Sequence, residues 1–262
     1  MERIGVAATA PFGADVLERL ASEHDVAFVV TRPDSRAGRG RKSTSPPAKE
    51  TAARLGIRVL QPERLGESVE LPAKTIVAVA YGLLVPRPLL KRHRWLNVHP
   101  SLLPRWRGAA PVERAIMAGD AETGVTIIEL VEALDAGPIA AQQAFPIGQD
   151  DDAGAVYAKA AAIAADLLAE LPSETRPQAE AGATYAEKIT PADRRLDWSR
   201  PARELHDRIR ALSPHIGARG ELHGRLVVVW KSRLDGDRLD VLEVQPEGRR
   251  RMTYDDFVRG LR

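Results

Sequence analysis

Short apolar runs alternate with amphipathic stretches along the first two thirds of the chain. The runs have the length and β-branched content of buried strands, whereas the stretches repeat apolar residues at the spacing of one helix face. Strands are predicted over residues 3–9, 26–30, 57–60, 75–80 and 95–99, and helices over 15–23 and 48–55. This alternation is typical of a doubly wound, mostly parallel α/β sheet with helices on both faces. We therefore predict that fold class, with residues 95–99 near the middle of the sheet.

The pattern then changes in the second half of this region. Residues 123–130 and 138–145 are predicted as two strands that bracket the turn VEALDAG, which contains Asp135. Pro111 is in the favoured position to open a helix that continues to residue 117. Residues 151–171 form an alanine-rich predicted helix with an acidic first turn, as the helix dipole prefers.

Composition shifts at residues 171–182, where Pro, Ser, Glu and Gly indicate a linker. We predict a catalytic domain over 1–171, a linker over 172–199 and a small C-terminal domain over 200–262. The last region contains a predicted helix at 202–212, strands at 221–231 and 238–244, and a terminal helix at 253–261. About 60 residues fold alone only marginally, so we expect this domain to depend on the first.

Composition excludes several classes of protein. Hydrophobic residues make up 44% and charged residues 28% of the 262 residues, as in ordinary globular proteins. The chain has no cysteine, which excludes disulfides, thiol nucleophiles and cysteine-bound metals. It shows no apolar run near 18 residues, no leader pattern, no phosphate-binding loop and no glycine-rich dinucleotide motif. We expect a cytoplasmic protein that contacts no membrane and holds neither a metal nor a nucleotide cofactor.

The run at 95–99 carries two polar residues, Asn97 and His99. Side chains at i and i+2 of a strand lie on one face, while Val98 points the opposite way. Pro100 ends the strand because it lacks a backbone donor. An amide and an imidazole are thus aimed at the same point. The alternative is an ordinary strand-to-helix connection, in which the Asn caps and the His only forms a hydrogen bond.

The stretch WLNVHPSLLPRWRGAAP at 95–111 resembles the active-site loop of the folate-dependent formyltransferases, and Asp135 matches the acidic residue of that family at its usual distance. The resemblance implies a Rossmann-like formyltransferase fold and formyl transfer from 10-formyltetrahydrofolate to an amine. It implies Asn97 as the oxyanion donor, His99 as general base or electrostatic partner, and Asp135 as the carboxylate that orients it. The alternative for Asp135 is a purely local role as a turn-forming residue, because Asp and Gly favour turns.

Other segments resemble the members of this family that act on methionyl initiator tRNA. They are AYGLLVP at 80–86, SLLPRWRGAAP at 101–111, GDAETGVTI at 119–127, TYAEKI at 184–189 and LDW at 196–198. The resemblance implies that initiator methionyl-tRNA is the acceptor. It also implies that the SLLP segment lines the folate site, with backbone groups at the pterin edge and apolar side chains on its faces. The implied folate-binding residues are Ser101, Leu102, Leu103 and Pro104.

A basic segment follows the second predicted strand. Its cations are Arg32, Arg36, Arg39, Arg41 and Lys42, interspersed with two glycines. A polar, glycine-containing loop of this kind is able to follow a phosphate backbone closely, although a solvated basic loop has the same composition. The resemblance implies that the loop enters the acceptor end of initiator tRNA, and Arg39, between two glycines, is the expected principal contact.

Two features depart from the family pattern. Ala8 stands where a glycine is usual, and the C-terminal region is several strands shorter than the barrel of the family, which resembles an oligonucleotide-binding fold. We therefore expect a truncated barrel. The shortening favours an alternative in which the acceptor is a small amine such as an amino sugar, and a non-catalytic RNA- or folate-binding relative is a further alternative. We expect a monomer.

Overall fold

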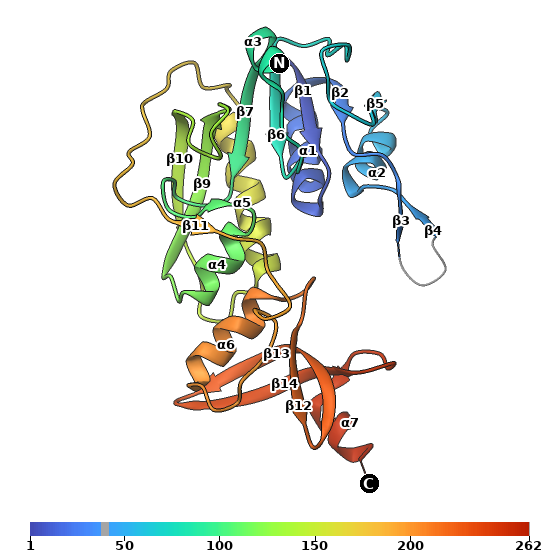
Figure 1. Ribbon diagram of the computed structural model, residues 1–262, viewed down its shortest axis with the longest axis vertical. Helices are drawn as coiled ribbons and strands as arrows, with labels where there is room; N and C mark the ends of the chain where they lie inside the picture. The colour runs from blue at the N-terminus through green and yellow to red at the C-terminus, as the bar shows by residue number, and fades with distance from the viewer. Residues whose placement is uncertain (38–41, 262) are drawn as a thin grey trace. The chain divides into compact units, whose positions relative to one another are not determined.

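A seven-stranded sheet organises the first part of the computed structural model, which describes residues 1–37 and 42–261 (Figure 1). The strand order is β10-β9-β7-β6-β1-β2-β5. The strands are β1 (Arg3–Ala8), β2 (Asp25–Val30), β5 (Val59–Leu60), β6 (Thr75–Val79), β7 (Arg94–His99), β9 (Glu122–Glu129) and β10 (Ile139–Pro146). β1, β2, β5, β6 and β7 pair in parallel, and β9 runs antiparallel to β7. The predicted mostly parallel sheet is confirmed, with β7 at its change of direction.

The chain divides into two compact units, and neither is a single continuous segment. One unit comprises Met1–Arg107, Gly124–Ala144 and Ala158–Ala183, and the other comprises Gly108–Thr123, Phe145–Tyr157 and Thr184–Arg262. The domain boundaries at 171 and 199 rest on the sequence and stay a prediction. Within the described residues, no helix combines the length and the apolar content needed to cross a membrane.

Buried apolar residues pack against the central strands of the sheet. Val16, Leu17 and Leu20 are the buried face of α1 (Pro11–Glu23), which packs on β1, β2 and β6 and against α2 (Pro47–Arg54). Phe28 and Trp95 belong to a separate buried cluster, and the Trp95 Nε1 donates to a carbonyl of α3 (Arg87–Arg92) at 3.1 Å. Because close-packed interiors have low compressibility, Trp95 anchors the start of β7.

Ala8, where the family pattern has glycine, is accommodated without strain. It is the last, extended residue of β1 and is fully buried. The close contact with neighbouring backbone occurs instead at Gly13, where an added Cβ would lie 2.5 Å from the Val79 carbonyl oxygen and 2.9 Å from the Ala8 Cβ. The chain therefore keeps glycine where contact with the backbone requires it.

The second unit contains a four-stranded antiparallel sheet, β12-β13-β14-β15. Its elements are α4 (Pro111–Met117), β11 (Tyr185–Ala186), α6 (Ala202–Ala211), β12 (Ala218–Leu222), β13 (Arg225–Asp235), β14 (Arg238–Pro246), β15 (Met252–Thr253) and α7 (Tyr254–Arg259), and the long α5 (Ala153–Leu168) runs through both units. Ile209 of α6, Val229 of β13 and Phe257 of α7 share one buried cluster. The small β-rich domain is confirmed, and β12 and β15 are strands that the apolar pattern did not predict.

An ion pair ties α4 to the segment after β11. The Arg114 guanidinium donates to both carboxylate oxygens of Asp193, at 2.8 and 3.0 Å, and to the carbonyls of Glu187 and Lys188. The two charged side chains are 20% and 22% exposed. The hydrogen bond from Arg114, with further bonds from Thr190, holds the pKa of Asp193 far below its usual range.

Replacing Asp193 with asparagine is expected to lower the free energy of unfolding at pH 7 by about 1.5–3 kcal/mol, the scale of hydrogen bonds to charged groups. Because the folded pKa is depressed, the stabilisation is fully present above the unfolded pKa of about 3.9 and is lost as the pH falls through the folded value. Urea unfolding from pH 3 to pH 7 measures this: the difference between wild type and Asp193→Asn should narrow toward low pH. A difference that does not vary with pH would contradict the assignment.

Candidate active site

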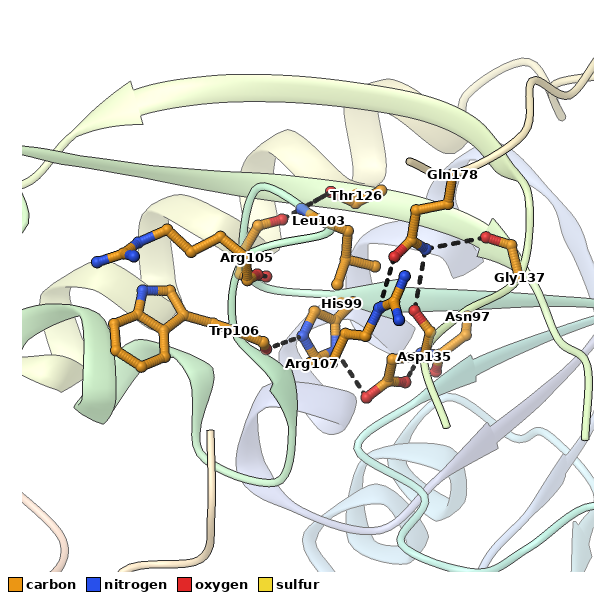
Figure 2. A network of polar contacts seen from close by, with 11 residues as sticks. Asn97, His99, Leu103, Arg105, Trp106, Arg107, Thr126, Asp135, Gly137 and Gln178 are labelled. Atoms are coloured by element: carbon orange, nitrogen blue, oxygen red, sulfur yellow. Dashed lines mark hydrogen bonds and ion pairs between the residues drawn. The ribbon is translucent and has the colours of Figure 1, made fainter. Parts of the chain in front are cut away.

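Asn97 and His99 stand at the end of β7, and both turn toward Asp135 (Figure 2). Asn97 pairs with Ala78 of β6 and Ile128 of β9, so neighbouring strands fix its backbone on both sides. His99 is the last residue of the strand and is only 4% exposed. The predicted common face of the amide and the imidazole is confirmed.

The hydrogen bond to a backbone carbonyl determines the tautomer of His99. Its Nε2 lies 2.8 Å from the carbonyl oxygen of Trp106. Because a carbonyl only accepts, Nε2 carries hydrogen, and the neutral ring leaves Nδ1 unprotonated. Nδ1 lies 3.7 Å from Asp135 Oδ2. The ring therefore presents an unprotonated nitrogen toward the Asp135 carboxylate.

Asp135 reaches this position because the turn between β9 and β10 folds back over β7. Its carboxylate is 11% exposed and accepts from Asn97 Nδ2 at 3.5 Å, a long hydrogen bond. Its backbone has φ 46°, a left-handed conformation that is uncommon outside glycine. The structure thus brings Asn97, His99 and Asp135 together.

The polar atoms of the SLLP segment hold the segment itself in shape. Ser101 is fully buried, and its hydroxyl donates to the Arg105 carbonyl at 2.7 Å. Thr126 of β9 donates to the Ser101 carbonyl and accepts from the Leu103 backbone nitrogen, and Gln142 donates to the Leu103 carbonyl. Leu102 packs over Gly124, where a Cβ would lie 2.3 Å from Leu102 Cδ2. The folate-binding role of Ser101, Leu102, Leu103 and Pro104 stays a prediction.

Several residues that shape the site were not identified from the sequence. Trp106 contacts His99 through its backbone carbonyl, and its own backbone has an unusual φ of 64°. Arg107, at the start of β8 (Arg107–Gly108), and Gln178 connect to the turn that carries Asp135. Trp106, Asp135 and Ala80 are three of the four non-glycine residues with positive φ in the described chain. Such strain concentrates at functional sites.

The predicted tRNA-binding segment is a hairpin in the described part of the chain. β3 (Ser35–Ala37) pairs antiparallel with β4 (Lys42–Thr44), so the backbones of Arg36 and Lys42 belong to its two strands. Arg39 and Arg41 lie outside the described residues. Arg32 is exposed, and its guanidinium donates to the carbonyl of Gly82 after β6. The role of these five cations stays a prediction.

Exposed apolar side chains occur in the two loops next to the site. Leu84, which follows β6, is 86% exposed, and Leu134, which precedes Asp135, is 61% exposed. Leu83 and Val131 in the same two loops are also exposed. Exposed leucines of this kind provide apolar surface that a ligand is able to cover. Within residues 1–37 and 42–261, no cluster of three or more His, Asp or Glu side chains is able to hold a metal ion.

Comparison with known proteins gives two family matches. Residues 3–171 match the model described as formyl transferase, and residues 188–240 match the model of the formyl transferase C-terminal domain. The methionyl-tRNA formyltransferase of Paracoccus denitrificans is 40% identical over 97% of this chain and 95% of its own length. That of Halorhodospira halophila is 41% identical over 99% of this chain and 96% of its own length.

Solved structures share the fold at low sequence identity. A methionyl-tRNA formyltransferase from Clostridium thermocellum superposes with a TM-score of 0.66 at 15% identity, covering 94% of this chain and 99% of its own. An N-formyltransferase from Helicobacter canadensis, in complex with folinic acid and dTDP-3-aminofucose, has a TM-score of 0.67 at 20% identity, covering 90% and 88%. These likenesses extend to both the parallel sheet and the C-terminal region.

Proposed function

The chain belongs to the formyl transferase family, and from this we infer that it transfers a formyl group from 10-formyltetrahydrofolate to the α-amine of methionyl initiator tRNA. The observation that carries this inference is identity of about 40% to methionyl-tRNA formyltransferases over nearly the full length of both chains. The geometry agrees, because one amide, one imidazole and one carboxylate meet at the end of β7. The chain is thus an enzyme of formyl transfer to an amine.

We assign the three side chains as follows. As the amine nitrogen bonds to the formyl carbon, negative charge develops on the formyl oxygen and a proton must leave the amine. Asn97 Nδ2 carries two hydrogens. One is donated to Asp135, and the second is available to bond to the formyl oxygen. Nδ1 of His99 takes the amine proton and returns it to the nitrogen that departs from the formyl carbon. Asp135 stabilises the imidazolium between these steps.

The residues present suit a folate. Bound 10-formyltetrahydrofolate supplies the formyl group. Leu84 and Leu134 offer exposed apolar surface for its rings beside Asp135. The segment from Ser101 to Pro104 is held rigid by Thr126 and Gln142, so it presents a preformed wall.

The hairpin that carries Arg36 and Lys42 is our proposed contact with the acceptor end of the tRNA, with Arg32, Arg39 and Arg41 as further phosphate contacts. Arg39→Ala is expected to raise the KM for charged tRNA and to reduce the slope of log K against log salt by about 0.7–0.9, the value for one phosphate contact. Filter binding from 50 to 200 mM salt measures it. Arg54→Ala, at an exposed arginine of α2 paired with Glu18, is the control. An unchanged salt slope would remove Arg39 from the contact.

One assay tests the proposed function. Purified protein is given 10-formyltetrahydrofolate with charged initiator tRNA, and separately with a panel of small amines that includes amino sugars. Formylation of the methionine α-amine supports the proposal. Transfer only to a sugar amine would select the alternative acceptor, and no transfer to any acceptor would select a non-catalytic relative.

We propose that the enzyme acts as a monomer in the cytoplasm, where its charged initiator tRNA is made. The absence of cysteine suits a reducing compartment. Sedimentation velocity at micromolar concentration tests whether the enzyme is a monomer, and a dimer would overturn that proposal. Cell fractionation tests the cytoplasmic location, and recovery of the protein in another fraction would overturn it.

A further inference from the structure

Gln178 lies in the segment predicted as a linker, yet its side chain belongs to the site in the first unit (Figure 2). Its Nε2 donates to the carbonyl of Asp135 and to the carbonyl of Gly137, both at 3.0 Å. Its Oε1 accepts from Nε of Arg107 at 2.7 Å. One amide therefore joins the turn after β9 to the end of the loop after β7.

The orientation of this amide is dictated by its partners. Arginine only donates and backbone carbonyls only accept, so the oxygen faces Arg107 and the nitrogen faces the turn. The Arg107 side chain is 3% exposed, and its guanidinium also donates to both carboxylate oxygens of Glu180, at 3.3 Å each; the Glu180 side chain is 80% exposed. Removing the Gln178 oxygen would remove the 2.7 Å hydrogen bond from Nε of this buried arginine.

The two loops that Gln178 joins hold opposite sides of His99. Trp106, the neighbour of Arg107, accepts from Nε2, and Asp135 faces Nδ1. Both Trp106 and Asp135 have left-handed backbones, which persist only when their surroundings hold them. A side chain that bonds to the Asp135 carbonyl and to Arg107 supplies such a restraint on both loops.

We propose that Gln178 is a positioning residue for catalysis, which sets the distance between the His99 imidazole and the Asp135 carboxylate by fixing both loops. The inference rests on the proposed roles of His99 and Asp135. The rival explanation is a purely structural one, in which Gln178 only anchors the polar segment after α5.

Glutamate at this position separates the two explanations. Gln178→Glu keeps the size and the acceptor for Arg107, and the new carboxylate pairs more strongly with the guanidinium. It loses the two donors and faces the Asp135 and Gly137 carbonyls with negative charge. A structural anchor would be kept or strengthened, whereas the positioning of Asp135 would be lost.

The experiment measures kcat, KM and the unfolding midpoint of Gln178→Glu and Gln178→Ala. Gln143→Ala, an exposed glutamine of β10, is the matched control. We expect kcat to fall roughly 10- to 100-fold in both variants, with KM for folate and tRNA within about threefold of wild type, since a misplaced catalytic group costs up to about 100-fold. The midpoint of Gln178→Glu should lie above that of Gln178→Ala, because only glutamate keeps the acceptor for Arg107. Wild-type kcat in Gln178→Glu would overturn the proposal.

A second readout does not depend on turnover. The ¹⁵N signals of the His99 ring, assigned by their loss in His99→Ala, should move in Gln178→Glu and stay in place in Gln143→Ala. Unmoved signals would overturn the positioning role even if the wild-type enzyme formylated no acceptor. If the wild-type enzyme formylated no acceptor but the His99 signals moved as expected, the result would count against the proposed function and not against the positioning role.

Discussion

Alanine in place of His99 is expected to lower kcat for formyl transfer by roughly 10²- to 10⁴-fold, the range supplied by a positioned general base. The substitution removes the ring nitrogen that faces Asp135 at 3.7 Å, together with the hydrogen-bond donor to Trp106. Because that carbonyl belongs to the loop and not to the substrate, KM should change far less than kcat. Stopped-time assays with charged initiator tRNA measure both constants.

Two further variants test the same assignment of the site residues. Asn97→Ala should cost roughly 10²- to 10³-fold in kcat, the effect of deleting one oxyanion donor, and Asp135→Ala should cost a comparable factor. His215→Ala, at an exposed histidine of the second unit, is the matched control and should leave kcat unchanged. Circular dichroism and the unfolding midpoint establish that each variant is folded. Wild-type rates in two of the three site variants would refute the assignment.

The central strands of the sheet were predictable from the sequence because they are buried on both faces. Runs such as TIVAV in β6 contain little except apolar residues, and burial follows from that composition. The short β3 and β4 were not predicted, because their residues, SRA and KST, are polar and carry no apolar period. β12 was not predicted for a similar reason: its sequence ARGEL alternates weakly and forms a strand through pairing with β13.

Within the site, side chains that act on a shared face were predictable and backbone groups were not. The shared face of Asn97 and His99 follows from the strand period, whereas their roles and that of Asp135 follow from the family resemblance. The Trp106 carbonyl has no sequence signature, because every residue has a carbonyl and the hydrogen bond of this one with His99 depends on the folded loop, in which Trp106 has a φ of 64°. Gln178 sits in a stretch whose composition indicates a spacer, and its role appears only once tertiary contacts are formed.

These observations place the turn after β9 under unusual constraint. Asp135 is left-handed, Gln178 holds the carbonyls of Asp135 and Gly137, and the Glu129 backbone nitrogen donates to the Pro138 carbonyl at 3.0 Å where the strands rejoin. A turn restrained at so many points has one conformation, and the position of the carboxylate depends on it. A change at the base of the turn should therefore reach the chemistry.

Gly137→Ala tests this dependence most severely. A Cβ on Gly137 would lie 1.7 Å from the Glu129 carbonyl oxygen, a backbone atom that is unable to rotate away. The turn must shift, at a cost of about 1–3 kcal/mol in the free energy of unfolding, as for other overpacked sites. Because Asp135 shifts with it, kcat should fall by at least about 100-fold. Urea unfolding and steady-state kinetics measure the two effects.

The control for this substitution is Gly66→Ala, which meets open space within 4 Å and should change neither stability nor rate by a comparable amount. Both effects are expected together in Gly137→Ala, because one displaced turn produces them. If Gly137→Ala lost stability but kept wild-type kcat, the turn would move without carrying the reacting geometry. Asp135 would then lose its role as the carboxylate that stabilises His99, and the proton transfer assigned to that pair would have to be supplied by another group.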